Sequence, residues 1–326
     1  MTIEIMMVLF AIVIVGFVAG KLGYMGGDFD KRLSNLVVDI TCPALILSST
    51  MGGRLPEREM ILPLLGISLL TYAILTGVAY TVPRYLTRRK DDEGVIGFAL
   101  MFGNVGFIGY PIVDSIFGHE AVFYAAVLNV VNTFAVFTVG TTLVKGGRWK
   151  VKGGRSKETG DGRQESGSSR SSGSSRSSGW KVLYSSPMVA AYLAMLIVAL
   201  NIDNVPRIIS GPLTMIGNIT VPAALLIIGS SMSQLSARTM LGNREVYLTT
   251  VCRLLLIPLG LYFLFRALGF SPYVVNINTL IIAMPVATYG TILCLKHNRD
   301  TALITEVTFI TTLLSVITIP LMTMLL

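Results

Sequence analysis

The sequence predicts an all-α integral membrane protein with ten transmembrane helices in two inverted five-helix repeats, whose fourth and ninth helices are broken and cross. Residues of the apolar set AVILMFWYC make up 52% of the 326 positions, and only 13% are charged. The mean hydropathy is +0.69, far above that of a soluble domain. A polar stretch in the middle leaves five apolar segments on each side, and an odd number per half gives the two halves opposite orientations in the membrane.

Ten apolar stretches are close to the roughly 20 residues that a helix needs to cross a hydrocarbon core of about 30 Å. We number them as segments one to ten in chain order. They span residues 3–23, 33–51, 60–83, 94–117, 121–144, 182–200, 207–235, 246–268, 273–295 and 301–326.

The polar stretch separates two halves of similar length. Residues 153–179 contain no aliphatic or aromatic side chain, so they cannot bury enough apolar surface to offset the entropy lost on ordering. The sequence therefore predicts a first five-helix repeat at residues 1–144, a disordered cytoplasmic linker at 145–180 and a second repeat at 181–326.

A short motif recurs in the two halves. The stretch DITCPALIL, which begins at Asp39 in segment two, shares five residues with NITVPAALL, which begins at Asn218 in segment seven. This match favours an internal duplication. Inverted repeats are the architecture of many secondary transporters.

The basic residues are distributed unevenly among the loops. Of the 26 Lys and Arg residues, 21 fall in loops on one predicted side and four in loops on the other, while Arg253 lies inside segment eight. Because basic loops stay in the cytoplasm, both termini are expected outside a plasma or inner membrane, with the central loop inside. This topology accounts for the net charge of +8 without nucleic acid as a partner.

Segments four and nine are interrupted by glycine and proline. Segment four contains GNVGFIGYP from Gly103 to Pro111, and segment nine contains MPVATYG from Met284 to Gly290. A proline inside a helix costs roughly 3 kcal/mol, and in hydrocarbon the freed carbonyl groups have no water to bond. Paired breaks of this kind point to a substrate cavity; prolines that only kink packed helices are the alternative.

The two breaks supply most of the candidate site. Half-helix N-termini present N–H groups that suit an anion, and a carboxylate is the natural ligand. We expect the breaks to meet near the membrane midplane, whereas Asn129 and Asn132 either complete the site or bond a neighbouring helix. The predicted substrate-binding residues are Asn104, Gly106, Gly109, Pro111, Asn129, Asn132, Pro285, Thr288 and Tyr289.

Three ionisable residues fall at membrane depth, where an unpaired charge is costly. Asp39 and Arg253 approach from the same side, so they either form an ion pair or leave Arg253 to contact the substrate. Glu306 is a candidate carrier of a coupling proton. Asp114 and His119 are expected in an outer loop, with the His119 side chain solvated.

Neither an enzyme nor a metal or cofactor site is predicted. The motifs H-E-x-x-H, G-x-G-D and G-x-S-x-G are absent, and Cys42, Cys252 and Cys294 lie in apolar segments without C-x-x-C spacing. The cysteines are therefore expected to pack as small apolar side chains.

Together, the motifs resemble those of the auxin efflux carrier family, which includes plant auxin exporters and bacterial organic-acid carriers. The resemblance covers nearly the whole chain. The matching motifs are GNxGxxGxP from Gly103, Arg253-Leu254 followed by Pro258, MPxA from Met284, and TLLS from Thr312 followed by Pro320.

The resemblance implies an elevator-like mechanism, in which segments three to five and eight to ten form a transport domain that moves against a scaffold of segments one, two, six and seven. It also implies a homodimer. Plant members carry an acidic and basic pair in their third helix, whereas residues 60–83 contain no charge here, which puts proton linkage through such a pair in doubt.

The leading hypothesis is a secondary carrier of a small organic anion, such as a carboxylate, with proton or sodium coupling left open. One alternative is a sodium-coupled symporter of the bile-acid type, which shares crossed broken helices; the paucity of carboxylates at membrane depth weighs against it. A passive channel or a non-transporting membrane sensor is the other alternative.

Overall fold

A computed structural model describes residues 2–51, 56–146, 185–202, 205–233, 243–297 and 299–326. The predicted linker at 145–180 lies outside these residues except for its first two positions. Within the described ranges, regular structure is helical apart from one isolated β-bridge. The all-α fold class is therefore confirmed for this part of the chain.

Helices occupy each of the ten predicted ranges. The first half contains α1 (Thr2–Lys21), α2 (Gly27–Leu36), η1 (Val37–Thr41), α3 (Cys42–Ser48), η2 (Arg58–Met60), α4 (Ile61–Thr81), α5 (Pro83–Leu86), α6 (Lys90–Met101), η3 (Val105–Gly109), α7 (Tyr110–Phe117), α8 (Glu120–Ala135), η4 (Val136–Gly140) and α9 (Thr141–Val144). The second half contains α11 (Ser186–Ala199), α12 (Arg207–Gly217), α13 (Thr220–Ser233), α14 (Arg244–Val251), η5 (Cys252–Leu256), α15 (Ile257–Ala267), α16 (Pro272–Ile282), α17 (Tyr289–Lys296) and α18 (Ala302–Leu325).

Several of these pieces join end to end into longer apolar rods. Among the described residues, five rods are long and apolar enough to cross a membrane, and shorter apolar helices accompany them. The five are Arg58–Thr81, Glu120–Val144, Arg207–Ser233, Arg244–Ala267 and Ala302–Leu325. Their number and composition are those of a multi-pass membrane protein.

Prolines account for three of the π-helical turns. Pro43, Pro111 and Pro258 each lie in the first two positions of the α-helix that follows η1, η3 or η5. A proline offers no N–H, and its ring clashes with the carbonyl group one turn earlier. A wider π turn removes that clash, and the residue before the proline closes the bond, as the Tyr110 N–H does to the Val105 carbonyl.

This arrangement corrects the expectation that Pro111 marks the break in segment four. Pro111 sits inside a continuous rod formed by η3 and α7. The helix is interrupted earlier, between the end of α6 at Met101 and the start of η3 at Val105. A π turn can therefore accommodate a proline without ending the helix.

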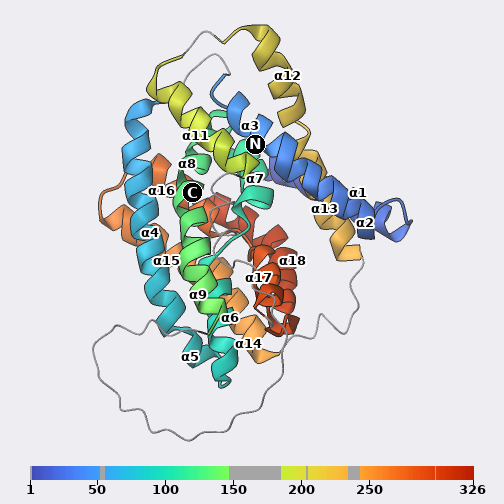
Figure 1. Cartoon of the computed structure of the whole chain (residues 1–326), viewed down its shortest axis with the longest axis vertical. Coiled ribbons are helices and arrows are strands. Elements are labelled where there is room, and N and C mark those ends of the chain that lie inside the picture. Colours follow the sequence, from blue (N-terminus) through green and yellow to red (C-terminus); the bar gives the residue numbers. More distant parts are fainter. Residues whose placement is uncertain (1, 52–55, 147–184, 203–204, 234–242, 298) are drawn as a thin grey trace, which may run out of the picture.

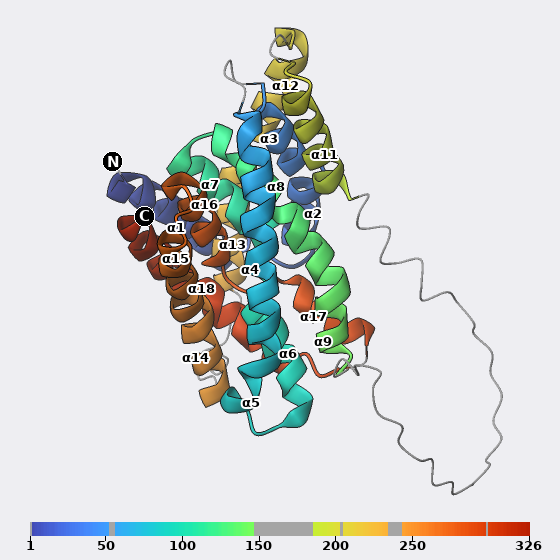
Figure 2. The same ribbon diagram turned by 90° about the vertical axis from the view of Figure 1, so that its left-hand side faces the viewer.

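We divide the helices into two groups for description; the groups also contact each other, as α11 contacts α8 and α13 contacts α7. The first helix group consists of α1, α2, η1, α3, α11, α12 and α13; within it, α1 packs on α13, and α11 and α12 pack on α3. Figure 1 shows α1 beside α13, and Figure 2 shows α3, α11 and α12 together at one end of the molecule. The second helix group consists of α4, α6, η3, α7, α8, η4, α9, α14, η5, α15, α16, α17 and α18. In this group α4 packs on α6 and α8, and α14 packs on α18.

Candidate functional site

The two interrupted segments meet through backbone hydrogen bonds. Gly103 and Val286 form an isolated antiparallel β-bridge. The Asn104 N–H donates to the Pro285 carbonyl at 2.8 Å, and the Ala287 N–H donates to the Phe102 carbonyl at 3.1 Å. These bonds satisfy polar groups that would otherwise be stranded by the breaks, so each interruption stabilises the other.

Four helix ends surround this crossing. α6 and α16 end at it, at Met101 and Ile282, whereas η3 and α17 begin at it, at Val105 and Tyr289. Carbonyl groups are left unsatisfied at a helix C-terminus and N–H groups at an N-terminus. The crossing therefore has a partially negative side and a partially positive side.

Arg253 lies on the carbonyl side. Its guanidinium donates to Leu100 O at 3.0 Å and Met101 O at 3.4 Å through Nη1, and to Met284 O at 3.3 Å through Nε. The side chain is 0% exposed. Asp39 instead lies exposed on η1, and no acidic group in the described ranges is within ion-pair distance of Arg253. The predicted Asp39–Arg253 ion pair is therefore wrong, because backbone carbonyl groups already surround the guanidinium.

Two adjoining cavities lie next to the crossing, and residues of both helix groups line them. The larger has a volume of about 460 Å³ and the smaller about 290 Å³. Asn104 and Thr288, the residues directly before η3 and α17, line both cavities. They face Ile227 and Ser231 of α13, which also line both.

Uncharged polar groups line the smaller cavity beside apolar ones. The side-chain amide of Asn104 forms no hydrogen bond with the described part of the protein, and the hydroxyl of Thr308 is buried without a partner there. Such groups are free to bond a ligand or water. The hydroxyl-bearing lining residues are Ser231, Thr288, Thr291, Thr305, Thr308 and Thr312.

Asp30 was not among the predicted site residues, yet it lines the larger cavity with its neighbour Lys31. Asp30 is 8% exposed and accepts bonds from the Gly26 N–H at 2.9 Å and the Ser230 hydroxyl at 2.6 Å. The position appeared to be part of a charged loop, because only the fold brings α2 against α13. The threonines of α18 were missed for the same reason.

The remaining predicted site residues are dispersed. Gly106 lines the larger cavity. Gly109, Pro111 and Pro285 are buried and do not belong to the linings of the two cavities. Glu306 is half-buried next to the lining residue Thr305 but is itself outside the lining.

Three further candidates bond to or pack against other side chains. The Asn129 side chain donates to the Tyr110 hydroxyl at 2.8 Å and accepts from the Asn132 side chain at 2.7 Å. Tyr289 packs edge-on against Phe137 with ring centroids 5.4 Å apart. Asn129 therefore links α8 to α7, whereas Asn132 bonds to a residue of its own helix, and neither lines the two cavities.

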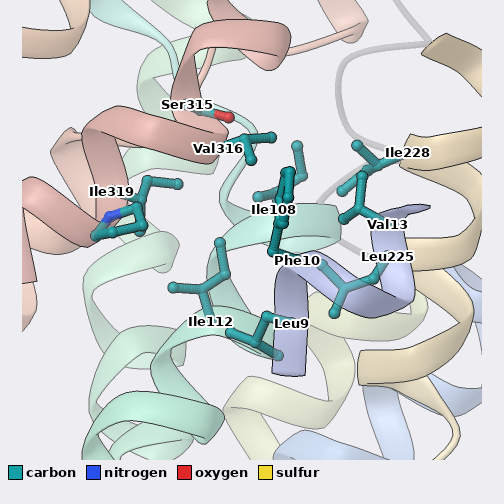
Figure 3. Close-up of a pocket in the computed structure, with 11 residues that line it drawn as sticks. Leu9, Phe10, Val13, Ile108, Ile112, Leu225, Ile228, Ser315, Val316 and Ile319 are labelled. Atoms are coloured by element: carbon teal, nitrogen blue, oxygen red, sulfur yellow. The ribbon is translucent and has the colours of Figure 1, made fainter. Parts of the chain in front are cut away.

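An apolar groove lies on the far side of the smaller cavity, and Figure 3 shows its lining. Ile108 and Ile228 line both spaces, so these two side chains separate the polar cavity from the groove. Leu9 and Val13 of α1 face Ile112 of α7 and Ile319 of α18 across it. The polar cavities are therefore bounded on this side by apolar side chains from both helix groups.

His119 links the two helix groups through its side chain. Its Nδ1 lies 2.9 Å from Asp114 Oδ1, and its Nε2 lies 2.9 Å from the Ser48 hydroxyl of α3. The expectation of a solvated His119 is therefore wrong, because both ring nitrogens are engaged. Asp114 belongs to α7 and not to a loop.

A double-mutant cycle tests this link. We expect Ser48→Ala and His119→Ala to be coupled by about 0.5–1.5 kcal/mol in the free energy of unfolding, because they share one hydrogen bond. Ser49→Ala is the matched control: its hydroxyl bonds within its own helix, to Ile46 O at 2.6 Å. Coupling of His119 to Ser49 as strong as that to Ser48 would contradict the assignment.

The comparisons with known proteins agree with a transporter. Residues 1–323 match the family described as membrane transport protein. The chain is 21% identical over 323 residues to an uncharacterized transporter of Methanocaldococcus jannaschii, with 98% of this chain and 96% of the relative covered. It is 25% identical over 330 residues to an uncharacterized transporter of Methanothermobacter thermautotrophicus, with the same shares covered.

Proposed function

Because the chain belongs to the membrane transport protein family, the auxin efflux carrier family that its motifs resemble, we propose that it is a secondary carrier of a small organic anion, working by elevator-like alternating access. The observation that carries this proposal is the placement of Asn104 and Thr288. Both residues precede a helix N-terminus at the crossing, and both line the two polar cavities.

The chemistry of the cavities supports an anion with an apolar body. The N–H groups at the start of η3 carry partial positive charge that suits a carboxylate, and the free amide of Asn104 can add one bond. Phe107 and Ile227 line both cavities, and Phe309 lines the smaller one. A carboxylate at the crossing would therefore place an apolar body against these side chains.

The two helix groups support alternating access. We assign the first helix group to the scaffold and the second helix group to the transport domain of an elevator, and residues of both groups line the cavities. Segment one packs on segment seven, while segment six packs on segment two. This exchange of partners is the pattern that two inverted repeats related by a pseudo-two-fold axis would produce.

The direction in which the cavities face supports an inward-facing state. The larger cavity is lined by Lys31 and by Pro187 at the start of α11, which lie next to loops expected in the cytoplasm. On the other side, Ile108 and Ile228 separate the smaller cavity from the apolar groove. A carrier in this state would exchange substrate with the cytoplasm.

Ligand-induced thermal shifts on the purified protein test the anion and its site. Benzoate and succinate serve as anionic probes and benzamide as an uncharged analogue of benzoate. We expect at least one carboxylate to raise the melting temperature and benzamide to leave it unchanged. Equal shifts with benzoate and benzamide would contradict the anion assignment.

Asn104→Ala is expected to weaken binding of the carboxylate that gives the largest shift by about tenfold or more, since a hydrogen bond to a charged group contributes about 1.5–3 kcal/mol. Asn276→Ala is the matched control, because its side-chain amide bonds to Leu326 O at 2.8 Å, away from both cavities. Uptake into proteoliposomes should follow the same order. Undiminished binding and uptake by Asn104→Ala would place the site elsewhere.

A further inference from the structure

The carbonyl side of the crossing has the composition of a cation site. Leu100 and Met101 contribute carbonyl oxygens from the end of α6, and Met284 contributes one from just beyond α16. Two helix C-termini therefore direct partial negative charge to one buried point. In transporters built on broken helices, such ends commonly coordinate sodium.

In this protein the guanidinium of Arg253 occupies the position between these carbonyl groups. A guanidinium carries its donors in a fixed planar fork, and three hydrogen bonds run from Arg253 to these carbonyl groups. Arg253 is fully buried, and within the described ranges no carboxylate pairs with it. Because a buried charge needs compensation, the carbonyl cluster is what holds this cation in place.

Gly103 is an independent sign that the crossing is shaped around the guanidinium. A Cβ atom built at Gly103 would contact Arg253 Nη2, and it would also lie 3.2 Å from Met284 O. The backbone of the fourth segment thus approaches the guanidinium as closely as a residue without a side chain allows. Any side chain at this position would displace it.

We propose that the carbonyl cluster formed by Leu100, Met101 and Met284 is a monovalent-cation site, which the chain fills permanently with the guanidinium of Arg253. This group takes the place that a dissociable sodium ion would occupy at the crossing. One consequence rests on the proposed carrier function: substrate binding and transport require no sodium at this position.

Chemical rescue tests the site without any transport measurement. Arg253→Ala is expected to lower the melting temperature by about 5 °C or more, because it empties a buried charge site. Millimolar methylguanidinium chloride should then raise the melting temperature of Arg253→Ala saturably, and leave the wild-type protein unchanged. Arg266→Ala is the matched control: it removes the same charge from an exposed position on the neighbouring α15.

Each outcome of the rescue is decisive. A shift confined to Arg253→Ala supports the site, and a sodium chloride shift confined to that variant supports it as well. If neither methylguanidinium nor sodium raises the melting temperature of Arg253→Ala, the proposal is overturned. Equal shifts in the wild-type protein, Arg253→Ala and Arg266→Ala overturn it as well. Potassium chloride at matched ionic strength corrects for general salt effects.

A second pair of variants keeps the test valid if Arg253→Ala does not fold. Arg253→Lys retains a tethered cation, whereas Arg253→Met retains much of the volume without charge. We expect the lysine variant to be the more stable of the two, and equal or greater stability of the methionine variant would overturn the proposal. Replacing sodium with choline in the carboxylate thermal shift then tests the coupling consequence, with no loss expected. Failure of the carrier proposal would leave the stability results intact.

Discussion

Gly103→Ala is expected to lower the melting temperature by about 5 °C or more, whereas Gly106→Ala leaves it unchanged or slightly raised. A methyl group at Gly103 would contact the guanidinium of Arg253. That guanidinium cannot move aside without losing its bonds to carbonyl groups, each worth about 1.5–3 kcal/mol for a charged donor. At Gly106 an added Cβ meets nothing within 4 Å, and alanine is the better helix former.

The two variants should also separate stability from function. Gly106 lines the larger cavity, so its methyl group is expected to weaken carboxylate binding while the fold persists. Thermal unfolding and ligand-induced shifts on the same preparations provide both measurements. Equal stability of the two alanine variants would mean that the guanidinium is free to move, and would argue against a site built tightly around it.

The meeting of the two breaks could be predicted from sequence because its cause is local. Glycine, asparagine and proline in the middle of an apolar segment leave backbone groups that hydrocarbon cannot satisfy. Two such segments, one in each half, can satisfy one another, and the bond from the Asn104 N–H to the Pro285 carbonyl does so. Asn104 and Thr288 lie beside this crossing and line both cavities, while their part in substrate binding stays a prediction.

The position of the break within segment four could not be read from its proline. The choice between a kink, a π turn and an interruption depends on where the freed carbonyl group finds a partner. The Gly106 carbonyl, which precedes Pro111 by five residues, accepts a bond from the Cys42 thiol at 3.6 Å. That partner comes from a segment distant in sequence, so the local pattern carries no signal for it.

The partner of Arg253 was missed for a related reason. Charge pairing at membrane depth suggests a carboxylate, and Asp39 was the candidate at a similar depth. An amino-acid sequence does not show which backbone carbonyl groups will lie at helix ends. Together, the carbonyl groups of two helix ends can nevertheless compensate the charge of a guanidinium. Asp30 illustrates the converse case, since the Ser230 hydroxyl that bonds it is 200 positions away.

Gly229→Ala is expected to destabilise the protein by about 1–3 kcal/mol, the usual cost of overpacking, by forcing α1 away from α13. A Cβ atom at Gly229 would contact Val13 O and would lie 2.7 Å from Phe17 N. Both atoms belong to the backbone of α1, so no side-chain rotation can relieve the clash. Close approach of two membrane helices over glycine is lost with the first added methyl group.

Gly16 makes the same contact from the opposite helix, because its Cβ would meet Leu226 O of α13. Both added methyl groups need a larger distance between α1 and α13. If the helices move apart as a whole, the first substitution already provides that distance for the second. The double variant of Gly16→Ala and Gly229→Ala should therefore cost clearly less than the sum of the single variants. Gly260→Ala, in α15 with no atom within 4 Å of its Cβ, is the control expected to show no loss. Additive losses in thermal unfolding would mean that α1 bends locally at each glycine and does not move as one helix.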